Sequence, residues 1–217
     1  CALPICYPRI PCITTDNPRP FWSVVVPAFN RESYLLQCLA SVLAQYRGED
    51  HMEIIVIDNG SEPGLKKHVD SIGRGIVHYH RHDETIPLQR NWNSAVNAST
   101  GRWVHLLHDD DYVLPGFYRA LEKALASSPD SVGAAFTAYE NINQHDEVVF
   151  QNQVLGSQRG VIHGWERIIG VSNVLNPPAV VVRRKAYEKI GGYSDEILYT
   201  TDWELYMRLV SYFDWLY

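Results

Sequence analysis

The stretch GRWVHLLHDDDYVLPG, residues 101–116, joins an apolar run to three consecutive aspartates, Asp109, Asp110 and Asp111. Adjacent carboxylates repel one another, so the charge of all three needs compensation. Water supplies it if the triplet is a surface turn. A divalent cation supplies it in a cleft, because Mg²⁺ prefers oxygen ligands and commonly binds carboxylates together with substrate phosphates. The position of the triplet in the fold therefore decides its chemistry.

Strand-like and helix-like segments alternate on both sides of this stretch. Short apolar runs typical of strands occupy residues 22–29, 52–61, 76–82, 102–108 and 132–142. Segments with helical spacing of apolar residues occupy residues 31–45, 62–72, 87–100, 114–128 and 200–213. This alternation predicts an α/β fold with a mostly parallel central sheet flanked by helices.

Two of the predicted helices carry finer expectations. Asn30 is the expected N-cap of the helix over residues 31–45. In the helix over residues 87–100, the spacing turns four apolar side chains inward, those of Leu88, Trp92, Ala95 and Val96.

Polar, loop-forming segments come directly after three of the predicted strands. They are PAFNRE at 27–32, IDNGSE at 57–62 and LHDDD at 107–111. In open α/β sheets, ligands bind beyond the carboxyl ends of the strands. The three segments therefore converge on one rim, and the aspartates lie where a ligand is expected.

Length and composition describe an ordinary globular chain of 217 residues, enough for one sizeable α/β domain. The net charge of −6 does not suggest a nucleic-acid binder. No apolar run approaches the roughly 20 residues of a transmembrane helix. Residues 1–20 hold five prolines, Pro4, Pro8, Pro11, Pro18 and Pro20, which predicts an extended, irregular lead-in.

The four cysteines, Cys1, Cys6, Cys12 and Cys38, lack the paired spacing of a zinc site. Without a signal-peptide pattern, we expect reduced thiols in a cytoplasmic protein, with the early cysteines as inert packing residues. The sequence has no initiator Met and stops in SYFDWLY, within an apparent helix. We therefore expect it to be a piece of a longer polypeptide.

Five segments in order resemble the nucleotide-binding core of family 2 glycosyltransferases, which have the GT-A fold. They are SVVVPAFNRESYLLQCLASVLAQ, IIVIDNGS, QRNWNSAVNASTGRWVHLLHDDDYVLPG, AVVVRRKAYEKIGGYSDE and TTDWELYMRL. The resemblance implies transfer of a hexose from a nucleotide-diphosphate donor, such as a UDP-sugar, to an acceptor hydroxyl, with inversion. It also implies Mn²⁺ or Mg²⁺ and a role such as polysaccharide biosynthesis. Residues 21–140 would form the nucleotide-sugar-binding half, and residues 141–217 the acceptor-binding half of the same domain.

The acidic motif of the family departs from its usual form here. If Leu107 aligns with the motif's leucine, His108 replaces its first Asp. Alternatively, Asp109 to Asp111 are themselves the Asp-X-Asp motif. Under both alignments Asp110 and Asp111 belong to the motif, and the resemblance makes them the metal ligands, with Asp110 as the principal one. His108 is either a further ligand or a hydrogen-bonded structural residue.

The resemblance also supplies a set of donor-binding residues. They are Pro27, Ala28, Phe29, Asn30, Glu32, Asp58, Gly60, Arg90, Asn91 and Asp109. Asp58 would contact the uracil or ribose, or it would only form an Asx-turn before Gly60. Glu32 would contact the base or ribose, or complement a helix dipole. Arg90 would bind phosphate, or form an ion pair that holds the acidic loop.

Asp202 matches the carboxylate that the family uses as general base. A structural reading competes, because Thr201 to Glu204 also reads as a capping box, with Thr201 as N-cap and Glu204 at N3. Trp165, Tyr193 and Trp203 are either platforms for an acceptor sugar or core residues.

Two other classes of function remain as alternatives. A catalytically inactive nucleotide-sugar or glycan-binding module would keep the same fold, although the presence of Asp110 and Asp202 argues against it. A nucleotidyltransferase usually carries a glycine-rich loop after its first strand, and PAFNRE has no glycine.

Overall fold

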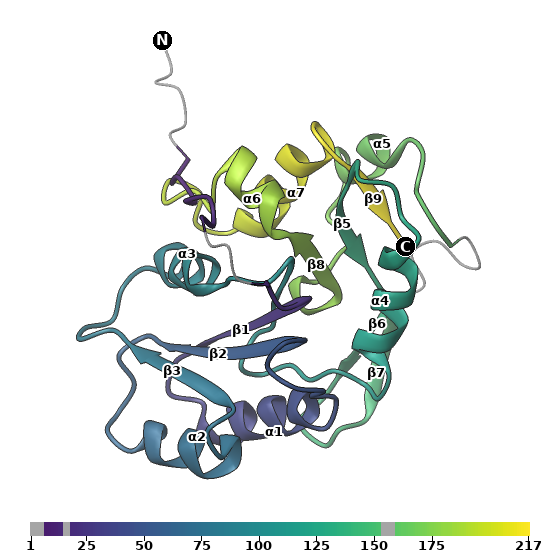
Figure 1. Ribbon diagram of the computed structural model, residues 1–217. Helices are drawn as coiled ribbons and strands as arrows, with labels where there is room; N and C mark the ends of the chain where they lie inside the picture. Colours follow the sequence, from purple (N-terminus) through teal and green to yellow (C-terminus); the bar gives the residue numbers. More distant parts are fainter. Residues whose placement is uncertain (1–6, 15–17, 153–158) are drawn as a thin grey trace.

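The computed structural model describes residues 7–14, 18–152 and 159–217. A sheet of seven strands, in the order β3-β2-β1-β4-β8-β5-β9, forms its centre (Figure 1). The strands are β1 (Trp22–Ala28), β2 (Met52–Asp58), β3 (Val77–Arg81), β4 (Trp103–Leu106), β5 (Val132–Phe136), β8 (Val180–Arg183) and β9 (Asp214–Leu216). Only β8 pairs antiparallel with its neighbours. The predicted mostly parallel sheet is therefore confirmed, and residues 141–217 add β8 and β9 to it.

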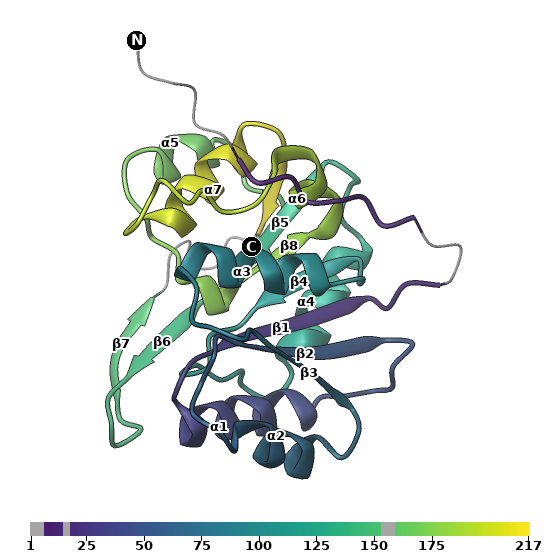
Figure 2. The same ribbon diagram turned by 90° about the vertical axis from the view of Figure 1, so that its left-hand side faces the viewer.

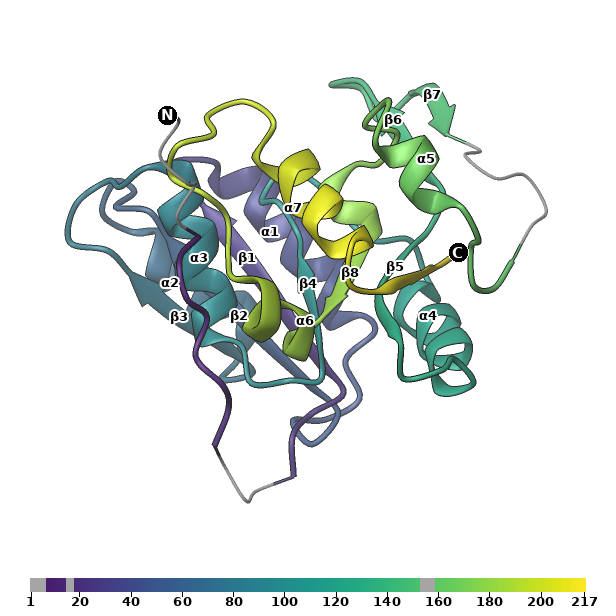
Figure 3. The same ribbon diagram turned by 90° about the horizontal axis from the view of Figure 1, so that it is seen from above.

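Helices cover both faces of the sheet (Figures 2 and 3). They are α1 (Glu32–Leu43), α2 (Leu65–Gly73), α3 (Leu88–Ala98), α4 (Phe117–Ala126), α5 (Trp165–Ile169), α6 (Arg184–Ile190) and α7 (Thr201–Val210), with a 3₁₀ turn η1 (Pro177–Ala179) before β8. The cluster with α1, α2 and α4 packs on one face, and the cluster with α3, α5, α6 and α7 packs on the other. Within the described residues, no helix is both long and apolar enough to cross a membrane.

The alternation of side chains along β1 explains why one apolar run serves both faces. Val24 and Val26 pack in the cluster that contains Leu35 of α1, whereas Val25 packs in the cluster that contains Trp92 of α3. Each of these valines is 0% exposed, and such burial contributes about 1.5–3 kcal/mol per side chain. A strand covered on both faces needs a continuous apolar sequence.

The single strand predicted over residues 132–142 is wrong, because the chain leaves the sheet after Phe136. Thr137 N donates to Ala179 O (3.0 Å), and β6 (Tyr139–Ile142) then pairs with β7 (Val148–Asn152) in a separate antiparallel hairpin. The hairpin stands out from the body in Figure 2. Its polar sequence does not suit a strand that is buried on both faces.

The predicted helical end of the chain is also wrong, since α7 ends at Val210 and β9 follows. β9 pairs parallel with β5. Gly133 of β5 makes room for this return, because a Cβ there would lie 2.3 Å from Cγ of Phe213. A contact of this kind cannot be read from local helical spacing.

Asn30 is not a helix cap. Its φ of 53° is left-handed, and its Oδ1 accepts a hydrogen bond from Glu62 N (2.8 Å). Asparagine tolerates this backbone conformation better than most residues, and its side chain ties the loop after β1 to the loop after β2. α1 begins at Glu32 without a side-chain cap.

Leu88 does not face the core as predicted, being 49% exposed, whereas Trp92, Ala95 and Val96 are buried. The first turn of α3 extends beyond the carboxyl edge of the sheet, where Leu88 lines a hollow instead.

The described residues of the lead-in, 7–14 and 18–20, contain no helix or strand, as predicted. They are nevertheless fastened to the domain. Ile10 is 1% exposed in the core, and Pro8 O and Pro11 O accept hydrogen bonds from Gly192 N and Arg184 Nη2.

The two described cysteines, Cys12 and Cys38, are free. Cys38 is buried in the core, but Cys12 is exposed, so the packing role expected for it is wrong. Cys1 and Cys6 lie outside the described residues.

His105 of β4 lies in the core and fixes the floor beneath the acidic loop. Its Nε2 is 2.9 Å from Pro178 O, and its Nδ1 is 3.0 Å from the Tyr118 hydroxyl. A carbonyl only accepts, so Nε2 carries the proton and Nδ1 accepts from Tyr118. Burial lowers the pKa of His105 to about 4, which keeps the ring neutral.

We expect this histidine to make stability depend on pH between about 4 and 6.5. As the pH falls through this range, the unfolded chain takes up a proton that the folded chain does not, so the free energy of unfolding falls by on the order of 3 kcal/mol. His105→Gln keeps a donor for Pro178 O but does not titrate. Denaturant unfolding at several pH values should therefore give a flatter curve for this variant. A variant slope as steep as the parent's would contradict the assignment.

Candidate active site

The carboxyl ends of β1, β2 and β4 meet at one edge of the sheet, as the sequence predicted. Three hydrogen bonds fasten their loops together. Asn59 N donates to Ala28 O (2.8 Å), Asn30 N to Ser61 Oγ (3.0 Å), and Phe29 N to Asp109 Oδ2 (3.0 Å). The acidic triplet is thus part of a rim built from three strands.

The three aspartates occupy three different environments. Asp109 is 6% exposed and accepts from Phe29 N, and burial raises its pKa. Asp110 is exposed and pairs with Arg31. Asp111 is half-buried, and burial followed by the charges of Asp110 and Asp109 raises its pKa to about 6. Asp111 has no arginine in its described ion pairs, and its Oδ2 lies 3.6 Å from His108 Nδ1.

Arg31 is a residue of this rim that the sequence analysis missed. It comes from the loop after β1, and its Nη1 pairs with Asp110 and lies 3.6 Å from Asp109 Oδ1. Both Arg31 and Asp110 are exposed, and ion pairs of this kind contribute only about 0–1 kcal/mol. A signal was present in the sequence, because Arg31 is the cation within PAFNRE, on the rim that also holds the aspartates.

His108, Asp110 and Asp111 form a group that suits a metal ion, since one ligand atom from each lies within 4.8 Å of the others. The His108 ring stacks on Trp92 (5.1 Å between centroids), and burial lowers its pKa, so the ring is neutral as a ligand must be. Its buried Nε2 has no hydrogen-bond partner among the described residues. Two carboxylates and an imidazole fit Mn²⁺, and the carboxylates alone fit Mg²⁺. His108 is therefore both a packed residue and a candidate ligand.

A hollow of about 370 Å³ lies beside this group, at the ends of β1 and β4. It is lined by Pro27, Ala28, Phe29, Arg31, Asn59, Leu88, Asn91, Trp92, His108, Asp109 and Asp110. Five of the predicted donor residues are thus brought together, namely Pro27, Ala28, Phe29, Asn91 and Asp109. Of the described residues that line it, Arg31 alone carries a permanent positive charge. Asn91 adds a buried Oδ1 that has no partner in the described structure.

Asp58 lies behind this hollow rather than in its wall. The side chain is 0% exposed, its Oδ1 accepts from Ser61 N (2.9 Å) and Ser61 Oγ, and its Oδ2 accepts from Tyr79. Arg81 Nε lies 3.3 Å from Oδ2. The bond from Ser61 N shows the turn-forming role that the sequence also allowed. Oδ1 is therefore fully used, and only Oδ2 has an exposed partner, Arg81.

Four other predicted donor residues, Asn30, Gly60, Glu32 and Arg90, lie outside the hollow's lining. Gly60 has a left-handed φ of 78°, and a Cβ there would lie 3.0 Å from Thr85 N, so glycine is required by the turn. Glu32 is exposed, with Oε1 2.7 Å from His68 Nδ1. Arg90 Nε bonds Asp195 Oδ2 (2.7 Å), so its ion pair holds the segment before α7 and not the acidic loop.

Asp202 lies in the first turn of α7, where the macrodipole favours a carboxylate. Asn173 Nδ2 donates to its Oδ2 (3.0 Å). The charge of Asp202 raises the pKa of His108, against the larger effect of burial, so its carboxylate lies near the group formed by His108, Asp110 and Asp111. The fold thus brings Asp202 to the rim from about 90 residues away in the sequence.

The capping box, which was the alternative to a catalytic role for Asp202, does not form. The N-cap is Thr200, which makes no side-chain capping bond, and Thr201 is the first residue of the helix. Glu204 binds Arg208 instead (Oε1 to Nε, 2.5 Å), and Arg208 also donates to Gly192 O. Glu204 therefore pairs with Arg208, one turn later in the same helix, and not with the backbone at the helix start. Thr201 is buried, and its Oγ1 has no partner among the described residues.

The three aromatic residues considered as sugar platforms are structural. Trp165 and Tyr193 are 1% and 3% exposed in the core. Trp203 is half-buried and packs against the core, where its Nε1 donates to Ile169 O (2.5 Å).

Comparison with known proteins extends this description. Residues 23–191 match the profile of glycosyl transferase family 2. An uncharacterized protein of Mycobacterium tuberculosis is 26% identical over 217 residues, covering 91% of this chain and 65% of that protein. The chain thus spans less than two thirds of that relative's length.

Two solved structures have a similar fold. S. aureus TarS in complex with UDP-GlcNAc superposes with a TM-score of 0.70 at 17% identity, covering 87% of this chain and 52% of that one. The mannosyltransferase PcManGT from Pyrobaculum calidifontis, in complex with GDP-Man and Mn²⁺, gives 0.66 at 16% identity, covering 99% and 57%. At these identities the likeness concerns the fold, and it confirms the predicted GT-A architecture.

We expect Thr201→Val to leave the free energy of unfolding within about 0.5 kcal/mol of the parent's, because the lost hydroxyl has no partner. If Thr201 were part of a capping box, its loss would instead lower the free energy of unfolding by about 1 kcal/mol. Ser99→Ala is the matched comparison, since the buried Ser99 Oγ does donate, to Val96 O (2.6 Å), and its loss should cost about 1 kcal/mol. Urea unfolding of both variants checks this. Equal losses would restore the capping role of Thr201.

Proposed function

Because the chain belongs to glycosyl transferase family 2, we propose that it is an inverting hexosyltransferase that uses a nucleotide-diphosphate sugar, a divalent cation and a hydroxyl-bearing acceptor. The observation that carries the proposal is the shared rim, where a hollow lined by donor-type residues, a metal-type group and the Asp202 helix lie together. The pairing of Arg31 with two of the aspartates adds a cation at the same place.

His108, Asp110 and Asp111 would hold Mn²⁺ or Mg²⁺. The cation, when bound, neutralises charge on the diphosphate leaving group. Asp110, as the exposed member, would be the accessible ligand. At Asp111, where burial and then the charges of Asp110 and Asp109 raise the pKa to about 6, the cation would favour the ionised carboxylate. Asp109 keeps its bond to Phe29 N and holds the loop in place.

Arg31 would bind the donor's diphosphate. Its ion pair with Asp110 is exposed and weak, so the guanidinium exchanges one set of oxygens for another at little cost in free energy. Guanidinium groups suit phosphate, because their donors match its oxygens in pairs. Arg31 thus neutralises the aspartates before the donor binds and the phosphates afterwards.

For the donor base we propose uracil, contacted through Asp58. Ser61 donates twice to Oδ1 and Tyr79 donates once to Oδ2, which leaves one lone pair of Oδ2 for a further donor once Arg81 moves aside. Uracil presents one imide N–H, which a single oxygen satisfies. Guanine presents two neighbouring donors, which need both oxygens of a carboxylate.

Asp202 would be the general base. A hydroxyl is a weak nucleophile near neutral pH, and a carboxylate that removes its proton during attack accelerates the transfer. Asn173 orients the carboxylate through Oδ2 and leaves Oδ1 for the acceptor. A single base with no covalent intermediate gives inversion.

The first test concerns the donor and the metal. Calorimetric titration should show that Mn²⁺ tightens UDP binding to the parent, and that UDP binds more tightly than GDP. Asp110→Asn should remove the Mn²⁺-dependent increment while melting near the parent temperature, because Asp110 is exposed. An intact increment in this variant, or a preference for GDP, would contradict the assignments of Asp110 and Asp58.

Arg31→Gln is the companion variant, because it changes the other member of the same ion pair. We expect it to weaken UDP binding roughly ten-fold both with and without Mn²⁺, and to leave uridine binding unchanged. Unchanged UDP affinity would show that Arg31 only balances the aspartates.

The second test concerns turnover, measured as release of UDP from a panel of UDP-sugars with hydroxyl-bearing acceptors. Asp202→Asn should keep donor affinity and melting temperature but lose about 10²–10⁴-fold in rate. Asp214→Asn, the same change at an exposed position on β9, should be as active as the parent. An active Asp202→Asn enzyme would reduce Asp202 to a helix-dipole residue worth about 0.3–1 kcal/mol. A parent that binds donor but never turns over would favour a binding module.

A further inference from the structure

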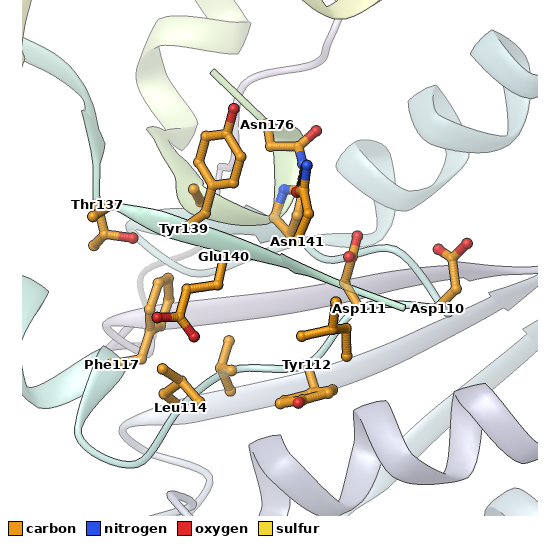
Figure 4. Close-up of a pocket in the computed structure, with 15 residues that line it drawn as sticks. Asp110, Asp111, Tyr112, Leu114, Phe117, Thr137, Tyr139, Glu140, Asn141 and Asn176 are labelled. Carbon is orange, nitrogen blue, oxygen red and sulfur yellow. Dashed lines mark hydrogen bonds between the residues drawn. The ribbon is translucent and has the colours of Figure 1, made fainter. Parts of the chain in front are cut away.

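A second hollow, of about 360 Å³, opens on the other side of the acidic loop (Figure 4). Tyr112, Leu114 and Phe117 lie along one side of it, and Asn141 and Asn176 lie opposite, with the aspartates at one end. Asp110 lines this hollow and the first one alike. The acidic loop is therefore a wall shared by two neighbouring cavities.

The walls of the second hollow are firmly built. Phe117 stacks on the buried His105 ring (5.0 Å between centroids), and His105 also bonds Pro178 of the opposite wall. Thr137 N donates to Ala179 O (3.0 Å), which fixes the start of the β6–β7 hairpin. Asn176 Nδ2 donates to Asn141 Oδ1 (3.5 Å), which joins the two segments on that side of the hollow. Three separate segments are thus held around one space.

The lining combines aromatic rings with amide and carboxylate groups. Aromatic faces pack on the apolar faces of a pyranose ring, while amides both donate to and accept from hydroxyl groups. Asp110, Asp111 and Glu140 are the charged residues among the described lining, which contains no Lys, Arg or His. Pockets of this composition, mainly apolar with a few convergent polar groups, are typical of small-molecule sites.

The charge of the lining selects among ligands. A phosphate, sulfate or carboxylate would face three carboxylates without a cation from the described lining. A metal ion at Asp110 and Asp111 does not reverse this, since the donor diphosphate beside it carries negative charge of its own. The hollow therefore suits an uncharged sugar ring.

The segment between α5 and η1 connects this hollow to the proposed base. Asn173 donates to Asp202, and Asn176, three residues later, lines the hollow. An acceptor whose reacting hydroxyl lies at Asp202 would therefore extend along this segment toward Tyr112 and Phe117. Because only three residues separate Asn173 from Asn176, neighbouring sugar units of one oligosaccharide could occupy the space at Asp202 and the second hollow together.

We propose that the second hollow binds an uncharged sugar ring of a glycan acceptor. This inference rests on the proposed function and adds the acceptor's chemical class, a neutral oligosaccharide rather than a phosphate-bearing or acidic polymer. The rival source of a sugar ring is the donor itself, whose sugar would enter the same space from the Asp110 side.

Binding without donor tests the proposal. The probes are neutral tetrasaccharides (cellotetraose, maltotetraose, chitotetraose and mannotetraose) and two anionic ones (tetragalacturonate and a hyaluronan tetrasaccharide), observed by saturation-transfer NMR and titrated. We expect at least one neutral probe to bind at least ten-fold more tightly than either anionic probe. Anionic probes that bind as tightly as the best neutral one, or no binding by any neutral probe, would overturn the proposal.

Variants then locate the binding. Asn141→Ala and Asn176→Ala, from two different segments, should each weaken the neutral probe about 3- to 10-fold, as expected for a lost hydrogen bond. Asn97→Ala, the same change on the exposed face of α3, should have no effect. Melting temperatures identify a variant that fails to fold. In that case the other asparagine variant still tests whether the second hollow binds the probe. Unchanged probe affinity in the folded variants would overturn the proposal.

Donor titrations distinguish the two sources of the sugar. If the acceptor occupies the hollow, both asparagine variants should bind UDP and UDP-GlcNAc as the parent does. A selective loss for UDP-GlcNAc would assign the hollow to the donor's sugar and overturn the proposal. Probe binding needs no turnover, so a parent that transfers no sugar would contradict the proposed function alone.

Discussion

The repulsion between three consecutive carboxylates at the end of β4 is the constraint on which the rest of the site depends. The structure resolves it by giving each aspartate a different environment. Asp109 is buried against Phe29 N, Asp110 faces solvent and Arg31, and Asp111 remains half-buried beside its two neighbours. The buried member secures the loop to β1, and the other two are left with charge that a cation offsets.

This division separates rigid parts of the site from exchangeable ones. Hydrogen bonds between the loops after β1, β2 and β4, and the neutral His105 below them, hold the backbone of the rim. The exposed pair between Arg31 and Asp110 is weak, as surface ion pairs are, so it yields to a ligand without disturbing the fold. Because Asp110 borders both hollows, a cation there would lie between the two proposed substrates.

The helix that carries Asp202 shows how one local pairing replaces another. Thr201 and Glu204 have the spacing of a capping box, yet Glu204 binds Arg208, which in turn holds the carbonyls after α6. The start of α7 therefore depends on the helix dipole and on packing, and Asp202 does not belong to a capping box. Asn173, from the segment after α5, orients it instead.

The sequence alone determined most of the strands and helices, the mostly parallel sheet and the rim on which the aspartates lie, because burial periodicity and strand ends are local properties. It also indicated most of the residues in the first hollow, through the family resemblance. Only the tertiary structure decided that Arg31 meets Asp110, that Asp58 is already bonded by Tyr79 and Arg81, and that the chain turns into a hairpin after Phe136. Each of these depends on a partner far along the chain or on the competition between partners, and neither is encoded in the spacing of neighbouring residues.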